Sequence, residues 1–280
     1  MIKEEPNMSK KLPEIELNYS TSKDSVWDNI VSSISEHVFI KPYQPITRTL
    51  LFKFAVAASL LLFVSVTSFM RFYITSVHAP AGQHIAFLLP DDSKVELNAQ
   101  SKISFHPYWF KTVRTLNLQG EAYFEVQKGS QFKVVSKLGE TTVVGTSFNI
   151  FARNTDYAVT CFTGKVSVFS PRSNESILIK PNEKAYLTND GNVLLASESD
   201  LNGAKAWREN MFVFTGSSIV DVCQEIERQY NIKIQVKANP ALTYTGNFSR
   251  SLSGKEVLNL VCTSLGIKFD AKSETEFLVK

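Results

Sequence analysis

The longest apolar stretch of the chain is Leu50–Ile74, and within it Phe54–Met70 is a run of 17 residues without a charge. A helix of that length covers about 25 Å, and the apolar flanks extend it to the roughly 30 Å hydrocarbon core of a bilayer. Lys53 and Arg71 can extend their charged ends to the two interfaces. The pattern predicts one transmembrane helix over residues 50–74.

Two other interpretations of this stretch were weighed. A signal peptide has a shorter apolar segment near the N-terminus, whereas this one begins some fifty residues into the chain. A buried helix of a soluble domain usually carries a polar stripe. Lys41, Arg48 and Lys53 precede the span, and only Arg71 closely follows it. Because cytoplasmic flanks are richer in Lys and Arg, we predict that the N-terminus is cytoplasmic.

A shorter apolar pattern precedes the span. Residues 1 to about 20 are polar and indicate a loose arm, and Ser22–Ser25 can cap a helix that runs to about Val38. Its apolar residues are three or four positions apart and form one stripe: Val26, Trp27, Ile30, Val31, Ile34 and Val38. So small a stripe favours docking into a groove of another protein. A helix lying on the membrane surface is the alternative, but few lysines follow its polar face. Pro42 and Pro45 indicate a linker to the span.

Beyond the span, hydrophobic residues alternate with polar ones from His78 to about Ser199, with turn signals every ten residues or so. Ile85–Leu89 and Lys94–Asn98 flank the turn Pro90–Ser93 and predict a hairpin. Further strands are expected at 101–105, 112–118, 122–126, 132–136, 140–144, 148–152, 157–162, 165–169, 177–179, 184–187 and 192–196. This pattern predicts an all-β domain over 78–200, either an antiparallel sandwich, a barrel or a β-helical stack.

The pattern changes again after a linker-like stretch from Asp200 to Trp207. Strands are expected at 212–214, 232–236, 241–248, 267–270 and 276–279, with helices at Ile219–Tyr230 and Ser253–Leu265. Strand, helix and strand therefore follow one another twice, which predicts a small α+β domain of βαβ-βαβ order over 207–280.

Composition narrows the function classes. The 280 residues carry a net charge of +3 with no basic stripe, so direct nucleic-acid binding is not indicated. The four histidines lack the spacing of a metal site, and no metal or cofactor is expected. The three cysteines cannot all pair within one chain. A Cys223–Cys262 disulfide and buried free thiols both remain open.

Side chains for conventional catalysis are not assembled in any recognisable motif. Glu121 and Glu125 fall on one strand face about 13 Å apart, beyond the spacing of a glycosidase pair, and are expected to be solvated, with a structural role left open for one of them. Phosphate-loop, dinucleotide and nucleophile motifs are missing from the sequence. Tyr108, Trp109 and Phe110 could stack on sugars. A membrane-anchored carbohydrate-binding module is therefore the alternative function.

Several segments together resemble a known family. Residues 89–99, 118–126 and 143–150 resemble the signature blocks of FecR-type anti-sigma factors, and 212–214, 225–232 and 244–248 resemble the C-terminal domain of Bacteroidetes-type members. Asp91-Asp92 stands where the family usually has Asp-Gly, and Pro181-Asn182-Glu183 where it usually has Pro-Gly-Glu. Asp and Asn tolerate the left-handed conformation, so both turns are expected to survive.

The resemblance implies a single-pass regulator of the inner membrane that is not a conventional enzyme. Residues 1–49 would sequester an extracytoplasmic-function sigma factor. The periplasmic domains would respond to the N-terminal signalling domain of a TonB-dependent outer-membrane transporter. We expect Val26, Trp27, Ile30 and Ile34 to contact the sigma factor, and the transporter signal to be received within Met211–Lys280. Some relatives cleave themselves at a Gly-Thr bond matched here by Gly145-Thr146, although a turn glycine followed by a strand threonine explains the pair equally well.

Overall fold

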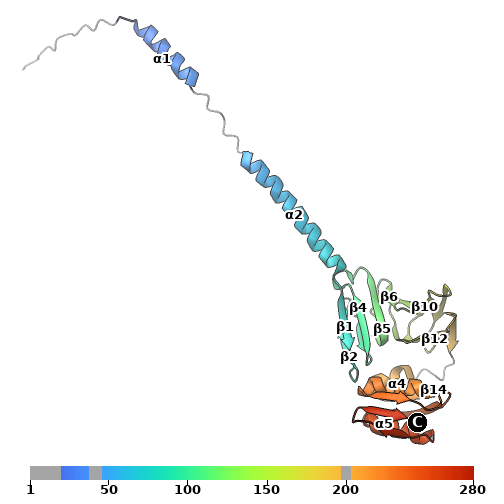
Figure 1. The fold of residues 1–280 in the computed structure, drawn as a ribbon. Helices are drawn as coiled ribbons and strands as arrows, with labels where there is room; N and C mark the ends of the chain where they lie inside the picture. The colour runs from blue at the N-terminus through green and yellow to red at the C-terminus, as the bar shows by residue number, and fades with distance from the viewer. Residues whose placement is uncertain (1–19, 38–45, 197–202) are drawn as a thin grey trace, which may run out of the picture. The chain divides into compact units, whose positions relative to one another are not determined.

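The computed structural model describes residues 20–37, 46–196 and 203–280 (Figure 1). The chain forms two compact units, residues 1–60 and 61–280, which divide inside the apolar helix. The expected N-terminal arm, the linker of Pro42 and Pro45, and the start of the expected linker at Asp200 lie outside the described residues. The predicted domain limits therefore stay a prediction.

The amphipathic helix is confirmed as α1, Lys23–His37. Its first turn is capped by Ser22, because the Ser25 backbone N–H donates to Ser22 Oγ at 3.3 Å and the Val26 N–H to the Ser22 carbonyl at 3.2 Å. Satisfying these otherwise unpaired amide groups stabilises the start of a helix that is too short to be stable on propensity alone.

The apolar stretch is confirmed as one helix, α2, Ile46–Phe72, of which Thr49–Phe72 is long and apolar enough to cross a membrane. The helix ends two residues before the predicted limit. Its last backbone bond joins the Tyr73 N–H to the Phe69 carbonyl, and the first strand begins at Thr75.

The region that follows is built almost entirely from strands, which we call the β domain (β1–β13). Their bounds are β1 Thr75–Ala79, β2 Ile85–Leu88, β3 Lys94–Leu97, β4 Ser101–Phe105, β5 Arg114–Glu125, β6 Phe132–Val135, β7 Glu140–Val143, β8 Ser147–Arg153, β9 Asp156–Thr163, β10 Val166–Ser170, β11 Glu175–Ile179, β12 Lys184–Leu187 and β13 Val193–Ala196. The predicted hairpin is confirmed as β2 and β3, paired from Ile85–Leu97 to Leu88–Lys94.

The two strands predicted at 112–118 and 122–126 are one strand, β5. Its first half pairs with β4 and β6, and its second half pairs with β3 and β8, so β5 passes from one sheet layer to the other. The change falls at Gly120, whose φ is +102°. A Cβ there would lie 2.5 Å from Ser101 Oγ, so only glycine fits this crossing.

One pair departs from the antiparallel sandwich that was among the three expected arrangements, because β6 runs parallel to β5 from Arg114–Phe132 to Asn117–Val135. Arg114 explains this course. Its guanidinium donates to the Gln127 and Ser130 carbonyls at 2.7 and 2.8 Å and so holds the β5–β6 connection against the start of β5. The remaining pairs of the β domain are antiparallel. Inward-facing residues of both layers form one core, including Ile103, Leu116, Val134, Leu97, Phe124, Phe148 and Ile150, which favours a two-layered sandwich.

Both expected left-handed turn positions are confirmed. Asp92 has a φ of +63° in the β2–β3 turn, and Asn182 has a φ of +68° before β12. Asp and Asn thus adopt the conformation that glycine would otherwise supply.

A separate core lies in what we call the C-terminal domain (residues 211–279). Its bounds are β14 Met211–Ser218, α4 Ile219–Tyr230, β15 Lys233–Val236, β16 Thr243–Ser249, α5 Gly254–Ser264, β17 Phe269–Ala271 and β18 Glu276–Val279. α3 Gly203–Ala206 and a 3₁₀ turn, Trp207–Glu209, precede it.

The predicted order of elements is confirmed, but the pairing is not that of two βαβ units. β14 pairs antiparallel with β16 in one sheet, while β15 pairs parallel with β18 in another, so each helix connects strands of different sheets. Cys161, Cys223 and Cys262 are buried free thiols, and burial raises the pKa of Cys161 and Cys262 to about 11.

Candidate functional site

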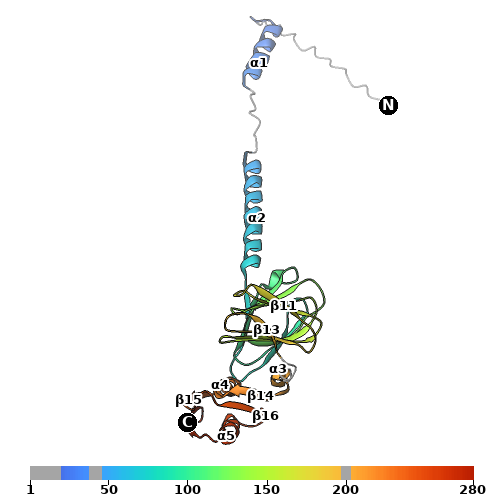
Figure 2. The same ribbon diagram turned by 90° about the vertical axis from the view of Figure 1, so that its right-hand side faces the viewer.

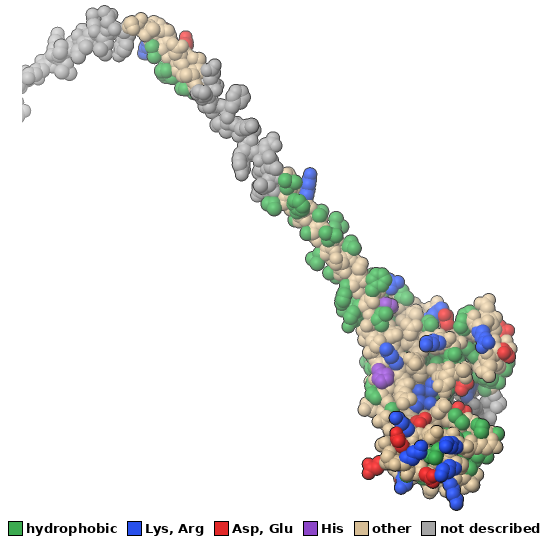
Figure 3. Space-filling model, in the orientation of Figure 1, with side chains coloured by type: hydrophobic (Ala, Val, Ile, Leu, Met, Phe, Trp, Pro, Cys, Tyr) green, Lys and Arg blue, Asp and Glu red, His purple; other side chains and the backbone are tan. Residues whose placement is uncertain are grey.

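The expected sigma-contact residues share the exposed apolar side of α1, where hydrophobic side chains gather in Figure 3. Val26, Trp27, Ile30 and Ile34 are 45, 66, 40 and 59% exposed. Ser32, on the other side, donates its hydroxyl to the Asn29 carbonyl at 3.0 Å. Four exposed apolar side chains in one stripe on a 15-residue helix form a surface suited to a hydrophobic groove.

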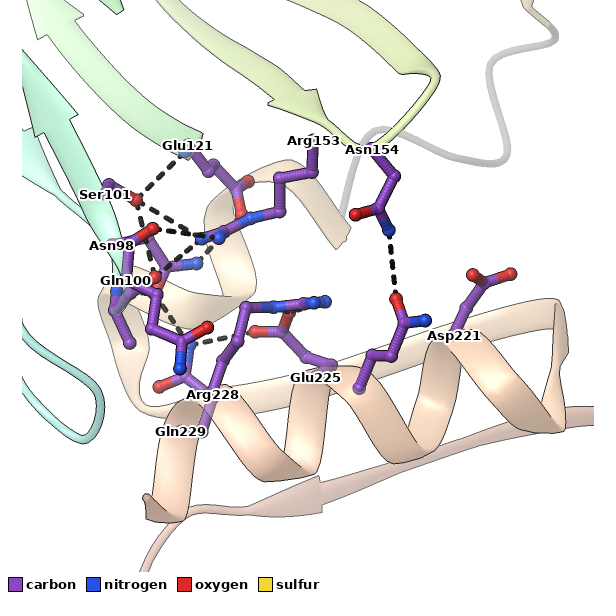
Figure 4. A network of polar contacts seen from close by, with 12 residues as sticks. Asn98, Gln100, Ser101, Glu121, Arg153, Asn154, Asp221, Glu225, Arg228 and Gln229 are labelled. Carbon is purple, nitrogen blue, oxygen red and sulfur yellow. Dashed lines mark hydrogen bonds and ion pairs between the residues drawn. The ribbon is translucent and has the colours of Figure 1, made fainter. Parts of the chain in front are cut away.

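The second candidate region lies between the β domain and α4, which is on the side of the C-terminal domain facing the β strands (Figure 2). Gln229 of α4 is 3% exposed and joins the two domains (Figure 4). Its Nε2 donates to Asn98 Oδ1 at 2.6 Å and to Glu225 Oε1 at 2.8 Å. Its Oε1 lies 3.0 Å from His84 Nε2. One buried amide therefore ties three polar groups together.

Glu121 extends this network into the β domain. Its two carboxylate oxygens accept hydrogen bonds from Asn98 Nδ2 at 2.8 Å and Asn149 Nδ2 at 2.9 Å. Burial raises the pKa of Glu121 and outweighs the opposing effect of Arg153. The expectation that Glu121 is solvated is wrong, because α4 covers this part of the sheet. Glu125 retains a 44% exposed side chain.

Arg153 of β8 holds the turn that carries Asn98. Its guanidinium donates to the Ala99 carbonyl at 2.7 Å and to the Gln100 carbonyl at 3.2 Å. Gln100 has a φ of +53°, so these charge-assisted bonds support a backbone conformation that is unfavourable for most residues.

Glu225 of α4 is buried close to two arginines. It pairs with Arg228, whose Nη2 lies 2.7 Å from Glu225 Oε2. Burial opposes ionisation of Glu225, but Arg228 and Arg153 outweigh it and lower the pKa of the carboxyl group. Glu121 and Glu225 thus sit in one network with pKa values shifted in opposite directions.

A second link between the domains is Arg208, which follows α3. Its Nε and Nη2 donate to the two Glu96 oxygens at 2.8 and 2.9 Å, and its guanidinium carbon lies 3.5 Å from the centroid of the Tyr123 ring. Hydrogen bonding to Arg208 lowers the pKa of Glu96 to about 2. Bidentate pairing and ring stacking together favour arginine over lysine here.

His84, one of the four histidines that lack the spacing of a metal site, is half-buried between the domains. Its ring meets Trp207 edge-on at 5.2 Å, and Arg250 Nη1 lies 3.4 Å from its Nε2. Burial lowers the pKa of His84. A cavity of about 300 Å³ adjoins this network, and Asn149 Oδ1 and Trp207 Nε1 in its lining have no hydrogen-bond partner.

Gly145 and Thr146 lie in the connection between β7 and β8. A Cβ at Gly145 would come within 2.6 Å of Lys128 Cγ, and Thr146 Oγ1 donates to the Lys165 carbonyl at 3.2 Å. These contacts account for a glycine and a threonine at the two positions. Self-cleavage between them stays a prediction.

The aromatic group that suggested sugar stacking is divided by the structure. Tyr108 and Trp109 are exposed, but Phe110 is fully buried against Phe105 and Phe132. Three adjacent rings are therefore not available as one sugar platform. Within the described ranges, no group of three His, Cys, Asp or Glu side chains could hold a metal ion.

Sequence reasoning did not single out Gln229, Arg153 or Arg208. Gln229 carried a signal that could have been read, since it lies three positions after Ile226 and falls on the apolar face of α4. A polar residue in such a stripe calls for a buried partner. Arg153 and Arg208 carried no comparable local signal.

Comparisons with known proteins agree with this architecture. Residues 75–167 match a family model described as FecR protein, and residues 211–279 match one described as FecR, C-terminal. Two crystal structures of a "putative anti-sigma factor" from Parabacteroides distasonis ATCC 8503, at 2.50 and 1.65 Å, share 29% identity and a TM-score of 0.67 with this chain. The match covers 74% of this chain and 98% of that chain. A search of the curated proteins found no match.

The two family segments together span more than half of the chain, and they correspond to the β domain and the C-terminal domain. The structural neighbour has the same combination over nearly its whole length. The chain belongs to the FecR family, and this membership, with the neighbouring structure, supports the role of an anti-sigma regulator.

Proposed function

We propose that the protein is a single-pass inner-membrane anti-sigma factor whose cytoplasmic α1 sequesters an extracytoplasmic-function sigma factor. The observation that carries the proposal is an exposed apolar stripe on α1, followed along the chain by a helix able to span a membrane. The family supplies the class of partner. Trp27 is the natural anchor of the contact, because large aromatic side chains dominate the energetics of protein interfaces.

Sequestration requires that α1 and RNA polymerase compete for the sigma factor. We infer that the apolar stripe occupies a groove that the sigma factor otherwise presents to the polymerase. The C-terminal domain would receive the signal of the N-terminal domain of a TonB-dependent transporter in the periplasm. The two binding events are then linked through one chain, and the transporter changes the availability of the sigma factor through a coupling free energy.

The test uses the full chain in nanodiscs and extracytoplasmic-function sigma factors from the same organism. Trp27→Ala combined with Ile30→Ala should abolish capture of the cognate sigma factor, because the two substitutions remove two of the four large apolar side chains of the stripe. Ser32→Ala, on the opposite side of the same helix, is the matched control and should retain capture. Equal capture by both variants would refute the assignment of α1.

The role of the C-terminal domain is tested separately. A chain that ends before Met211 should still capture the sigma factor but should no longer respond to the transporter. If the transporter still triggers release of the sigma factor in this variant, signal reception lies outside residues 211–280.

A further inference from the structure

The connection between α2 and the β domain is very short. α2 ends at Phe72 and β1 begins at Thr75, so only Tyr73 and Ile74 separate them. Two extended residues reach at most about 7 Å. Wherever α2 leaves a bilayer, the first residues of β1 must therefore lie next to the bilayer surface.

Strand register brings another segment to the same level. Thr75 of β1 lies opposite Phe105, the last residue of β4, and the chain continues from there into the turn His106–Val113. We call this segment the aromatic turn. It contains a 3₁₀ turn, Pro107–Trp109, and it lies at the α2 end of the β1–β4 pair.

The aromatic turn contacts the end of α2 directly. His106 Nδ1 lies 3.1 Å from the Tyr73 carbonyl oxygen, and the rings of Tyr73 and Tyr108 are 5.8 Å apart. The Tyr73 ring in turn lies 5.3 Å from that of Phe69, which is inside the apolar span. A series of aromatic rings therefore continues from the span onto the turn.

One side chain of the aromatic turn is buried in the core of the β domain, and two others are exposed. Phe110 is fully buried and meets Phe105 and Phe132 edge-on at 5.3 and 5.9 Å. Tyr108 and Trp109 are 52 and 39% exposed. Burial of Phe110 fixes the backbone, so its aromatic neighbours are presented with little entropy left to lose on contact.

We propose that the aromatic turn is a membrane-contact site, in which Tyr108 and Trp109 insert into the headgroup region of the leaflet where α2 ends. The proposal rests on α2 spanning the membrane. Trp and Tyr prefer this region because each ring has an apolar body and a polar tip. Arg71 and the exposed Lys111 lie two residues from Tyr73 and Trp109 in the sequence, so positive charges that can pair with lipid phosphates flank this level of the chain.

This contact has a consequence for signalling. A two-residue connection alone would leave the β domain free to tilt about the end of α2. A second attachment at the aromatic turn fixes the direction in which the β domain leaves the membrane. A signal received by the C-terminal domain then acts on a β domain with a fixed orientation relative to the membrane.

The test measures the depth of Trp109 with the full chain reconstituted in phosphatidylcholine–phosphatidylglycerol vesicles. Trp27→Phe removes the tryptophan of α1 and leaves Trp109 and the buried Trp207. The emission lost on adding Trp109→Phe to this variant is the signal of Trp109. It is measured with and without phosphatidylcholine that carries a nitroxide quencher on its headgroup. The control reporter lies in the C-terminal domain. It is Leu260→Trp, at an exposed position of α5, introduced into the chain that carries Trp27→Phe and Trp109→Phe.

The proposal predicts that headgroup quencher removes most of the Trp109 emission and leaves that of Leu260→Trp nearly unchanged. Equal quenching of the two reporters, or an unquenched Trp109 in protein that resists extraction by alkaline carbonate, overturns the proposal while α2 still spans. An unquenched Trp109 would also be the result if the two rings bound sugars instead of lipid. Release of the protein by carbonate overturns the membrane span and the contact site together.

Discussion

Replacing Gln229 with alanine tests how the β domain and the C-terminal domain are held together. The substitution removes three hydrogen bonds, to Asn98, to Glu225 and to His84. A neutral hydrogen bond contributes about 0.5–1.5 kcal/mol net, and one to a charged group about 1.5–3. The better helix propensity of alanine returns a few tenths of a kcal/mol. The bond to Glu225 lies within α4, so only the bonds to Asn98 and His84 join the domains, and we expect a loss of roughly 1–3 kcal/mol in the free energy of domain docking.

A backbone hydrogen bond reports this loss directly. The Gly82 N–H of the β domain donates to the Arg228 carbonyl of α4 at 2.8 Å. Its amide hydrogen exchanges only when the two domains separate locally. Since about 1.4 kcal/mol corresponds to a tenfold change, exchange at Gly82 should accelerate by roughly 5- to 140-fold in Gln229→Ala.

Gln224→Ala is the matched control, because Gln224 lies on the same helix. Its side-chain oxygen accepts a hydrogen bond from Asn154 Nδ2 at 3.0 Å in an exposed position. Loss of an exposed contact costs less than about 0.5 kcal/mol, so Gly82 exchange should change by less than about threefold. Hydrogen exchange by mass spectrometry or NMR on the full chain measures both. Equal protection of Gly82 in the two variants would refute the role assigned to Gln229.

Three further predictions concern single side chains. Arg208→Ala should raise the pKa of Glu96 from about 2 toward its usual 4.5, with Arg208→Lys in between; an NMR titration that still finds it near 2 would contradict the assigned pair. Asp92→Gly should stabilise the protein by up to about 1 kcal/mol in chemical denaturation, because Asp92 has a φ of +63°; a clear loss of stability would show that its side chain matters. The lowered pKa of His84 means that the docked state favours the neutral ring. The free energy of docking is therefore at its full value above pH about 6.5 and declines as the pH falls. Gly82 exchange, corrected for its intrinsic pH dependence, should accelerate in acid. The acceleration should be smaller in His84→Asn, which lacks the titrating ring.

The elements that sequence reasoning predicted well are those with strong local signals. α4 was predicted at Ile219–Tyr230 and has those bounds, because Ser218 caps it through a hydrogen bond from the Asp221 N–H. Its apolar residues recur at helical spacing and pack into one core. The left-handed turn positions Asp92 and Asn182 follow from the family resemblance together with the conformational tolerance of Asp and Asn.

The misses arise where distant residues decide the outcome. Gly120 falls between the strands expected at 112–118 and 122–126, and its positive φ lets one continuous strand pass between two layers. The parallel placement of β6 depends on the side chain of Arg114, which no local pattern reveals.

The polar network was beyond sequence reasoning for the same reason. Asn98 and Gln229 are 131 positions apart, and Glu121, which accepts a hydrogen bond from Asn98, is buried in the network that forms where α4 docks. A carboxylate on a strand with alternating polarity is ordinarily solvated, so its burial followed from tertiary contact alone.

The proposed role of α1 is to withhold a sigma factor from RNA polymerase. Competition binding tests this role with the full chain in nanodiscs, its cognate extracytoplasmic-function sigma factor, and core RNA polymerase. We expect core polymerase and the full chain to displace each other from the sigma factor, and Trp27→Ala with Ile30→Ala to remove this competition. A stable complex containing the full chain, the sigma factor and core polymerase together would contradict it.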